Sequence, residues 1–377
     1  MRDPSASRPA EHPVPRRVGG GSRRHRLAIV LLVGLCLAPG LCGAAGAADP
    51  HGAARRGAAP RDAAGRYTNL RGGLGHGSVG VRFPFFLRRL VGLFRTRPGA
   101  PPRIVNDGAF LRANARHSVP TVTWVGHSTL LVQMGHQSFL TDPIWSRTPS
   151  PVRWLGPRRF VPPGLPLESL PPIDFVLVSH NHYDHLDLES LEELSERNPE
   201  ARFLVPLGNG ALLRGHGVRH VEELDWGERR RIGELEIHCL PAQHWSRRGF
   251  LDERRALWSS WAVVGPDRRF YFAGDSGAFP GFRQIGDALG PFDLAALPIG
   301  AYQPAAMMRE WHLDPEQAVR AGLDLRAEHL LAIHFGTFDL SDEPLFEPPL
   351  RFRAAAREQG LAPERVWVLD IGETRRF

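Results

Sequence analysis

The 377-residue sequence contains no lysine and only 3 cysteines. Cys36 and Cys42 lie in an apolar N-terminal segment, so a processed chain retains Cys239 alone. This excludes a disulfide scaffold and a structural zinc cage built from thiolates. The main apolar run, Leu27–Ala38, is shorter than the roughly 20 residues of a membrane-spanning helix, which argues against a polytopic membrane protein. With 42% hydrophobic and 23% charged residues, the chain has enough apolar material for a folded core.

Acidic residues are scarce only in the first part of the chain. Up to Arg116, 20 arginines face 5 acidic residues, whereas from His117 onward 27 arginines face 35 acidic residues. The net charge of +7 therefore belongs to the N-terminal part. It gives no reason to expect nucleic acid as a partner of the remaining chain.

Residues 1–48 have the features of a secretory signal peptide. Arginines precede the apolar run, and a small-residue stretch with an Ala-x-Ala site at Ala45–Ala47 follows it. We expect cleavage near Ala47 or Ala48 and export in a Gram-negative bacterium, to a periplasmic or peripheral membrane location. The alternative is an uncleaved membrane anchor, for which a run of about 12 residues is short.

Residues 49–116 form a basic arm rich in Gly, Pro, Ala and Arg, much of which we expect to be loosely ordered. Within it, Phe83–Arg95 mixes apolar residues with arginines and predicts a short helix that starts after Pro84. Two interpretations are open. The helix lies on an anionic lipid surface with its apolar side chains in the interface, or it packs on the main domain with its arginines in solvent.

A regular pattern begins near residue 117 and continues to residue 377. Short apolar runs bounded by turn residues predict strands, and helical patterns interleave with the later ones. This order indicates an α/β fold in which two sheets form the core and helices lie outside. The expected strands are 121–125, 129–133, 138–141, 174–179, 202–206, 236–240, 260–264, 269–273, 294–299, 329–333 and 366–369, and the expected helices are 188–197, 282–289, 315–321 and 344–357.

Four metal-competent side chains fall within six residues, directly after the expected strand 174–179. Because residues i and i+2 of an extended chain point to the same side, His180 and His182 can meet one cation. A turn then lets Asp184 and His185 reach another. Imidazole and carboxylate ligands without thiolates are typical of a catalytic metal site with an open position. The alternative is a solvated turn that happens to be rich in histidine.

Three later residues also follow expected strands, each with a turn beyond it. They are His244, Asp275 and His334. Gly274 and Gly277 flank Asp275 and permit a tight turn that aims its carboxylate. Taken singly, each residue is equally compatible with a hydrogen-bonded polar group of the core. The joint pattern favours one metal centre.

The order His-x-His-x-Asp-His, then His, Asp and His, resembles the metallo-β-lactamase superfamily. Flanking stretches resemble, more narrowly, its N-acylphosphatidylethanolamine-hydrolysing phospholipase D branch, over roughly Val119–Phe377. These stretches are Thr123–Thr129, Leu140–Ile144, Leu170–Asp174, Ser179–Asp187, Gly290–Ala295 and Pro298–Tyr302. The resemblance implies an αββα sandwich with a dinuclear metal site at the sheet edge, and a hydrolase domain spanning residues 117–377.

Position by position, the resemblance implies two zinc ions per chain, although iron or manganese fits the same ligands. One ion is held by His180, His182 and His244, the other by Asp184, His185 and His334, and Asp275 bridges them. The implied catalytic residues are Asp184, Asp275 and His312. A hydroxide between the two metals then attacks phosphorus.

Three further residues are expected around these ligands. Asp142 is expected to orient a ligand histidine, and His127 to be a hydrogen-bonded structural residue. His312 matches a histidine that lies near the family site and is expected to contact the phosphate or donate a proton. The alternative for His312 is a residue that merely neighbours a helix N-terminus.

Substrate contacts are the least defined part of the expected site. Tyr183 and Gln243 are expected to line the pocket, unless their side chains face away. Where animal members of the branch carry a Gln-Tyr pair, this chain has Arg153 and Trp154. An arginine there strengthens anion binding and admits a different headgroup.

The leading hypothesis is therefore a zinc-dependent phosphodiesterase of phospholipase D type. It hydrolyses N-acylphosphatidylethanolamine-like lipids at a membrane surface to phosphatidic acid and N-acylethanolamine, and a homodimer is a further expectation. One alternative is a hydrolase of the same fold that acts on a lactone, a β-lactam or another phosphodiester. Another is a membrane-binding scaffold whose metal site is vestigial.

Overall fold

The computed structural model describes residues 58–72, 75, 77–92, 99–152 and 154–377. The expected signal peptide, 1–48, lies outside the described residues. Of the helices in the described ranges, none combines the length and the apolar character that crossing a bilayer requires.

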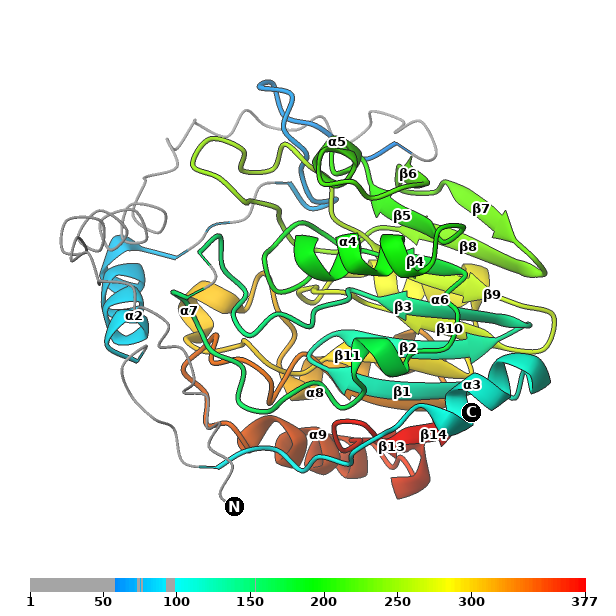
Figure 1. The fold of residues 1–377 in the computed structure, drawn as a ribbon. Helices are drawn as coiled ribbons and strands as arrows, with labels where there is room; N and C mark the ends of the chain where they lie inside the picture. Colours follow the sequence, from blue (N-terminus) through cyan, green and yellow to red (C-terminus); the bar gives the residue numbers. More distant parts are fainter. Residues whose placement is uncertain (1–57, 73–74, 76, 93–98, 153) are drawn as a thin grey trace, which may run out of the picture. The chain divides into compact units, whose positions relative to one another are not determined.

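The first sheet has seven strands in the order β14-β1-β2-β3-β4-β5-β6 (Figure 1). Strands β1 to β3 form an antiparallel meander, and β3 to β6 run parallel to one another. The strands are β1 (Thr121–Gly126), β2 (Thr129–Met134), β3 (Gln137–Thr141), β4 (Phe175–Leu177), β5 (Arg202–Pro206), β6 (Val221–Leu224) and β14 (Thr374–Arg376).

The second sheet also has seven strands, in the order β13-β12-β11-β10-β9-β8-β7. Strands β7 to β10 are antiparallel, whereas β10 to β13 are parallel. The strands are β7 (Arg229–Ile232), β8 (Leu235–Leu240), β9 (Ser260–Val264), β10 (Arg269–Phe272), β11 (Leu294–Pro298), β12 (His329–Ile333) and β13 (Val366–Trp367).

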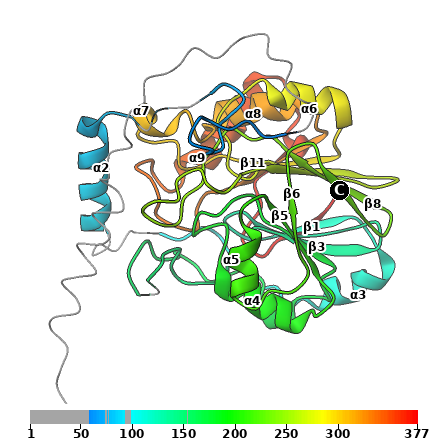
Figure 2. The ribbon, with the colours of Figure 1, turned by 90° about the horizontal axis from the view of Figure 1, so that it is seen from above.

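Helices cover both outer faces of the two sheets. Seen from above, α3, α4 and α5 lie on one side and α6, α8 and α9 on the other, with the strands between them (Figure 2). The helices are α2 (Val79–Gly92), α3 (Ala109–His117), α4 (Leu188–Arg197), α5 (Gly210–Gly215), α6 (Gly281–Leu289), α7 (Ala305–Met308), α8 (Pro315–Asp324) and α9 (Glu347–Glu358). The predicted αββα layer order is confirmed.

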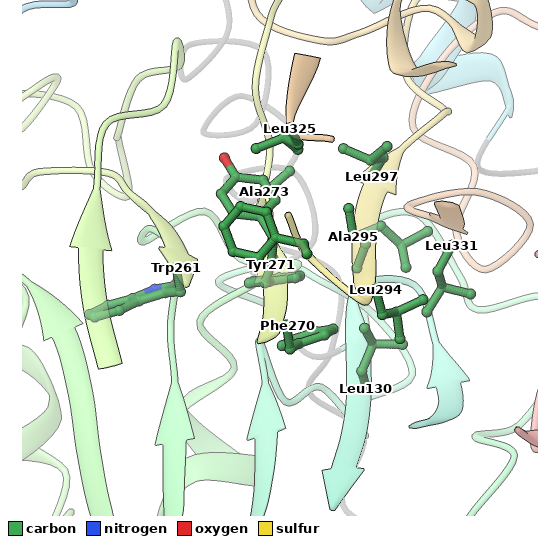
Figure 3. Packing of buried hydrophobic residues seen from close by; sticks show 14 of the residues in the cluster. Leu130, Trp261, Phe270, Tyr271, Ala273, Leu294, Ala295, Leu297, Leu325 and Leu331 are labelled. Atoms are coloured by element: carbon green, nitrogen blue, oxygen red, sulfur yellow. The ribbon is translucent and has the colours of Figure 1, made fainter. Parts of the chain in front are cut away.

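The strands of the core are buried on both faces, which explains their continuous apolar runs. In β2, Leu130 and Val132 belong to the larger cluster, which contains residues of both sheets, and Leu131 belongs to the smaller cluster, which contains Leu191 and Leu194 of α4. Figure 3 shows Leu130 from the first sheet close to Phe270 from the second. Successive side chains of one strand therefore pack in turn against the opposite sheet and against the helices.

Parts of the arm differ from the expectation of loose order. Helix α3 runs across the predicted start of the hydrolase domain at residue 117, and its Leu111 is fully buried. Tyr67, further upstream, is 2% exposed and belongs to the larger hydrophobic cluster of the core. The apolar side chains that these segments bury explain why they pack on the sandwich, although Gly and Pro surround them.

The helix predicted after Pro84 begins earlier, at Val79, with Pro84 inside it. The structure bears on the second interpretation, packing on the main domain, and the lipid-surface interpretation stays a prediction. Arg88 and Arg89 form ion pairs with Asp342 and Asp339 of the main domain, rather than lying free in solvent. Apolar side chains of the same helix stay exposed, among them Phe83 at 52% and Leu87 at 50%.

Candidate metal centre

The predicted ligands converge because their strands end at the same edge of the sandwich. His180 to His185 follow β4 in the first sheet, whereas His244, Asp275 and His334 follow β8, β10 and β12 in the second. Within the second sheet, β8 and β10 are both antiparallel to β9, and β10 is parallel to its neighbour β11 and so to β12. The carboxyl ends of these strands therefore share one edge, where loops can present ligands.

The first group of ligands consists of three histidines from two loops. The Nε2 atom of His180 lies 2.8 Å from Nδ1 of His182, and Nε2 of His244 lies 3.2 Å from the same Nδ1 atom. The rings of His180 and His244 are buried, and that of His182 is partly buried. Their facing nitrogens form a group that can hold one metal ion. We call this group the first triad.

The second group contains Asp184, His185 and His334. The Oδ2 atom of Asp184 lies 3.4 Å from Nε2 of His185 and 3.5 Å from Nε2 of His334. These atoms also lie close enough together to hold an ion. We call this group the second triad.

Asp275 lies between the two triads, as predicted. Its Oδ2 atom is 3.1 Å from Nε2 of His185 and 3.2 Å from Nε2 of His334. The same oxygen lies 4.0 Å from Nε2 of His180 and 3.8 Å from Nε2 of His244. One carboxylate thus faces both triads, which is the arrangement that a bridging ligand requires.

Several polar atoms at this centre are buried without a hydrogen-bond partner. They include Nε2 of His182, His185 and His334, and Oδ1 of Asp275. Buried polar groups in folded proteins almost always have partners, so unpaired nitrogens and a carboxylate oxygen in one place are typical of residues that bind a cation. The residues present therefore fit a divalent metal, and nitrogen and oxygen donors without thiolate suit a catalytic ion.

Asp142 and Ser179 hold two of the ligand rings. The Oδ2 atom of Asp142 accepts a hydrogen bond from Nδ1 of His185 at 2.6 Å, so Asp142 contacts one of the candidate ligand histidines. Ser179 donates to the same carboxylate at 2.6 Å and lies 2.9 Å from Nδ1 of His180. One buried carboxylate thus orients a ring in each triad, in one case through the serine hydroxyl.

Three residues of the centre adopt left-handed backbone conformations that non-glycine residues rarely take. The φ angles are 55° for His127, 36° for Asp142 and 59° for His334. Gly274, before Asp275, has φ 57°, and a Cβ atom on it would lie 2.5 Å from Cβ of Ser179. Tight turns that only packing can stabilise are typical of functional sites.

The electrostatic field at the centre favours positive charge. Burial opposes protonation of His334, but the carboxylates of Asp275 and Asp184 raise its pKa to about 9. At His182, burial lowers the pKa to about 4, so this ring is neutral at pH 7 and available as a ligand. The carboxylates that retain a proton on His334 would equally attract a metal cation.

His127 and His312 both lie at the centre. The Nε2 atom of His127 is 3.0 Å from Oδ2 of Asp184, and its ring is 4.1 Å from the ring of His334, measured between centroids. The hydrogen-bonded role expected for His127 is compatible with this contact, but the same geometry also groups His127 with Asp184, His185 and His334 as side chains that could hold a metal ion. His312 is 13% exposed and its Nδ1 lies 3.8 Å from Oδ2 of Asp275, so it reaches both the metal ligands and solvent.

The expected substrate contacts have mixed outcomes. Tyr183 lines a cavity of about 940 Å³ beside the segment His180–His185, which we call the His-rich loop. Gln243 is 3% exposed, and its amide donates to the carbonyls of Ala278 and Glu310, so it connects two neighbouring loops. Trp154 is 59% exposed, and Arg153 lies outside the described residues.

Two residues that the sequence analysis does not single out also hold the ligand loops. Arg248 donates to the carbonyls of Asn181 at 3.1 Å and Leu186 at 2.7 Å, and so clasps both ends of the His-rich loop. Asn69, in the arm, hydrogen-bonds to the backbone of His244. Nothing local marks either position, because the sequence is rich in arginine and the contact of Asn69 spans 175 residues.

Comparison with known proteins gives a consistent result. A family model described as "Beta-lactamase superfamily domain" matches residues 137–335. An N-acyl-phosphatidylethanolamine-hydrolyzing phospholipase D of Caenorhabditis elegans is 41% identical over 67% of this chain and 74% of its own length. A mitochondrial protein of Saccharomyces cerevisiae with the same description is 34% identical over 68% of this chain and 55% of its own length.

A solved structure shares the fold. It is a metallo hydrolase from the archaeon Ignicoccus hospitalis, with a TM-score of 0.53 and 25% sequence identity, covering 69% of this chain and 98% of its own. With the buried histidines and carboxylates at the strand ends, these relatives account for the centre as the metal site of a hydrolase. The chain therefore belongs to the metallo-β-lactamase superfamily, in its N-acylphosphatidylethanolamine-hydrolysing phospholipase D-like branch, and is a metal-dependent hydrolase.

Proposed function

We propose that this hydrolase is a zinc-dependent phosphodiesterase of phospholipase D type. Its substrate is an N-acylphosphatidylethanolamine-like lipid, and its products are phosphatidic acid and an N-acylethanolamine. The observation that carries the proposal is the position of Asp275 Oδ2, within 4.0 Å of ring nitrogens from both triads. The descriptions of the worm and yeast relatives supply the substrate class.

The chemistry divides between the ions and the chain. A pair of divalent cations, when bound, lowers the pKa of water toward about 7 and neutralises charge that develops on phosphate oxygens. The first triad and the second triad would hold one ion each, with Asp275 shared between them. Their burial excludes bulk water, which strengthens every electrostatic interaction with a phosphate group.

His312 is the residue best placed to act on the substrate itself. Burial lowers its pKa to about 4, so at pH 7 the ring is neutral and its Nδ1 has no hydrogen-bond partner. Since it lies beside Asp275 and is partly exposed, it can contact the phosphate. To protonate the leaving alkoxide, the neutral ring would first have to take up a proton from water.

Helix α2 supports a lipid substrate. Val79, Phe83, Leu87 and Val91 recur every four residues, so they form one stripe along the helix, and they are 43–71% exposed. Arg88, 52% exposed at its side chain, lies beside the stripe. An exposed apolar stripe is suited to the interface of a bilayer, where the proposed substrate resides, and it carries this argument because Arg88 is already paired with Asp342.

The activity test uses purified full-length protein with zinc and without, in mixed micelles of N-acylphosphatidylethanolamine. Mass spectrometry should detect phosphatidic acid and N-acylethanolamine in equal amounts, and a chelator should abolish both. Lactones, β-lactams and soluble phosphodiesters are assayed in parallel. Faster turnover of a lactone or β-lactam would contradict the phosphodiesterase proposal and favour another hydrolase of the same fold.

The lipid contact is tested with a Phe83→Ser, Leu87→Ser double variant. Its sedimentation with anionic vesicles should fall, because about 2 kcal/mol of transfer free energy is lost for each apolar side chain. The matched control is Leu350→Ser, at a position in α9 that is 65% exposed. Equal vesicle binding by the double variant and the control would exclude the stripe as the membrane contact.

A further inference from the structure

A segment of the arm, residues 58–72, lies against the main domain and is drawn in blue at the top of Figure 1. We call it the N-terminal strap. The amide of Tyr67 donates to the carbonyl of Arg254 at 2.8 Å, and the amide of Ala59 donates to Oδ1 of Asp225 at 3.0 Å. Burial of the Tyr67 ring in the core fixes the strap more firmly than these two bonds alone.

Asn69 is the residue of the strap that reaches the metal centre. Its Nδ2 donates to the carbonyl of His244 at 2.9 Å, and its Oδ1 accepts from the amide of His244 at 3.0 Å. The same Oδ1 accepts a third bond from Nε1 of Trp258 at 3.2 Å. The side chain is 3% exposed, so these bonds are shielded from water.

Asn69 gives the backbone of His244 hydrogen bonds that the residues next to His244 do not provide. His244 lies four residues beyond the end of β8, in a loop without regular secondary structure. Within the described residues, no other hydrogen bond to the backbone N–H or C=O of His244 is found. Asn69 therefore takes the place that a neighbouring strand would have, and pairs with both backbone groups of a ligand residue.

The ring of His244 is held from a second direction. Its Nδ1 lies 3.0 Å from the carbonyl of Trp311, which leaves Nε2 facing the first triad. With the backbone fixed by Asn69 and the ring fixed by Trp311, the aim of Nε2 is determined. Loss of either support lets the ring turn away from the other two histidines.

We propose that Asn69 is a positioning residue of the first triad, so that the N-terminal strap is part of the metal centre. The inference rests on the proposed two-ion site. It predicts that changing Asn69 weakens metal binding at the first triad without altering any ligand atom. A purely structural role predicts lower stability with unchanged metal affinity.

The chain contains a matched control for this geometry. Asn114 in α3 makes the same pair of bonds with Val119, donating from Nδ2 to its carbonyl at 2.8 Å and accepting from its amide at 3.1 Å. Asn114 is 2% exposed, and its other contacts are with Thr121 and Gln133. Val119 carries no metal ligand, so Asn114→Ala removes an equivalent clamp at a position without a role in metal binding.

The experiment titrates zinc into metal-free full-length protein against a chromophoric chelator, with thermal unfolding of the metal-free form measured in parallel. Wild type should bind two zinc ions. Asn69→Ala should bind the ion of the first triad about 10- to 100-fold more weakly, the usual effect of losing a group that orients a ligand. Asn114→Ala should lower the unfolding temperature of the metal-free protein by a similar amount and keep wild-type zinc affinity.

Asn69→Asp keeps the test decisive if the alanine variant does not fold. The carboxylate has the same shape and accepts from the amide of His244 and from Trp258, but it cannot donate to the carbonyl of His244. We expect weaker zinc binding in this variant too. Wild-type zinc affinity in Asn69→Asp, or an equal loss in Asn114→Ala, would overturn the inference. Absence of zinc binding in wild type would instead refute the proposed metal site.

Discussion

The two halves of the metal centre are built in different ways. The first sheet supplies four ligands from one loop of six residues, His180 to His185, between β4 and α4. The second sheet supplies three ligands, His244, Asp275 and His334, each from the end of a different strand. The first half is therefore a local structure, and the second exists only when the sheets have assembled.

The supports of the two halves differ only in part, because Arg248, which follows β8 of the second sheet, also holds the His-rich loop. The His-rich loop is held by its neighbour Ser179, by Asp142 from the adjacent strand, and by Arg248 across both of its ends. In the second half, the backbone of His244 depends on Asn69, and the amide of His334 donates to the carbonyl of His127 in the other sheet. Precision at the dispersed ligands is therefore a property of the tertiary structure.

The largest expected effect comes from the residue that joins the halves. Asp275→Asn keeps the shape of the side chain but removes the charge that faces both triads. We expect turnover to fall by about a thousandfold or more, equivalent to about 4 kcal/mol of transition-state stabilisation, and the second zinc ion to be lost. Activity assays and metal analysis measure the two effects.

The control for this change is Asp174→Asn. Asp174 accepts from the amide of Ser138 at 2.7 Å and lies just before β4, at the opposite end of that strand from the His-rich loop. It should keep full activity. Retention of both ions and activity in Asp275→Asn would show that the two triads work independently. It would contradict the view that Asp275 joins the two halves of the centre.

An intermediate effect is expected where the two halves touch. In Gly274→Ala, the new Cβ would lie 2.5 Å from Cβ of Ser179, in a backbone conformation that alanine rarely adopts. Overpacking of this kind lowers the free energy of unfolding by about 1–3 kcal/mol, and the displaced Ser179 should carry His180 with it. Urea denaturation measures the first effect, and zinc titration the second.

Gly215→Ala is the matched control for Gly274→Ala. Gly215 ends α5, and a Cβ there would meet nothing within 4 Å. We expect a neutral or slightly stabilising change, because alanine restricts the unfolded chain. If both variants unfold at the same urea concentration, the contact between Gly274 and Ser179 does not constrain the centre.

The difference between local patterns and features that depend on the assembled fold also explains which elements the sequence predicts and which it misses. The core strands and α4 are predicted within a few residues, because runs such as Phe175–Leu177 are buried on both faces. Strand β7, with the sequence Arg-Arg-Arg-Ile, is missed because it forms the edge of its sheet and needs no apolar face. Strands β6 and β14 are missed at the edges of the other sheet for the same reason.

Among site residues, the seven candidate ligands are recognisable because their chemistry is in their own side chains. Gln243 shows the limit of this reasoning. Its amide has the chemistry of a substrate contact, but burial directs it to backbone carbonyls. Asn69 shows the converse, since an asparagine in a Gly- and Arg-rich arm gains a role only through the fold.

The smallest expected effect concerns the His-rich loop, where it separates the support given by Ser179 from the support given by Asp142. Ser179→Ala removes the hydroxyl between Oδ2 of Asp142 and Nδ1 of His180, but leaves the direct bond from Asp142 to His185. One net hydrogen bond is worth about 1 kcal/mol, so we expect a decrease of about fivefold in zinc affinity at the first triad alone. The second triad should bind as in wild type.

Ser138→Ala serves as the control, because Ser138 is buried near the start of β3 and hydrogen-bonds to Gln133. Equal weakening at both triads in Ser179→Ala would mean that Asp142 acts through its overall position, with no separate route through the serine to His180.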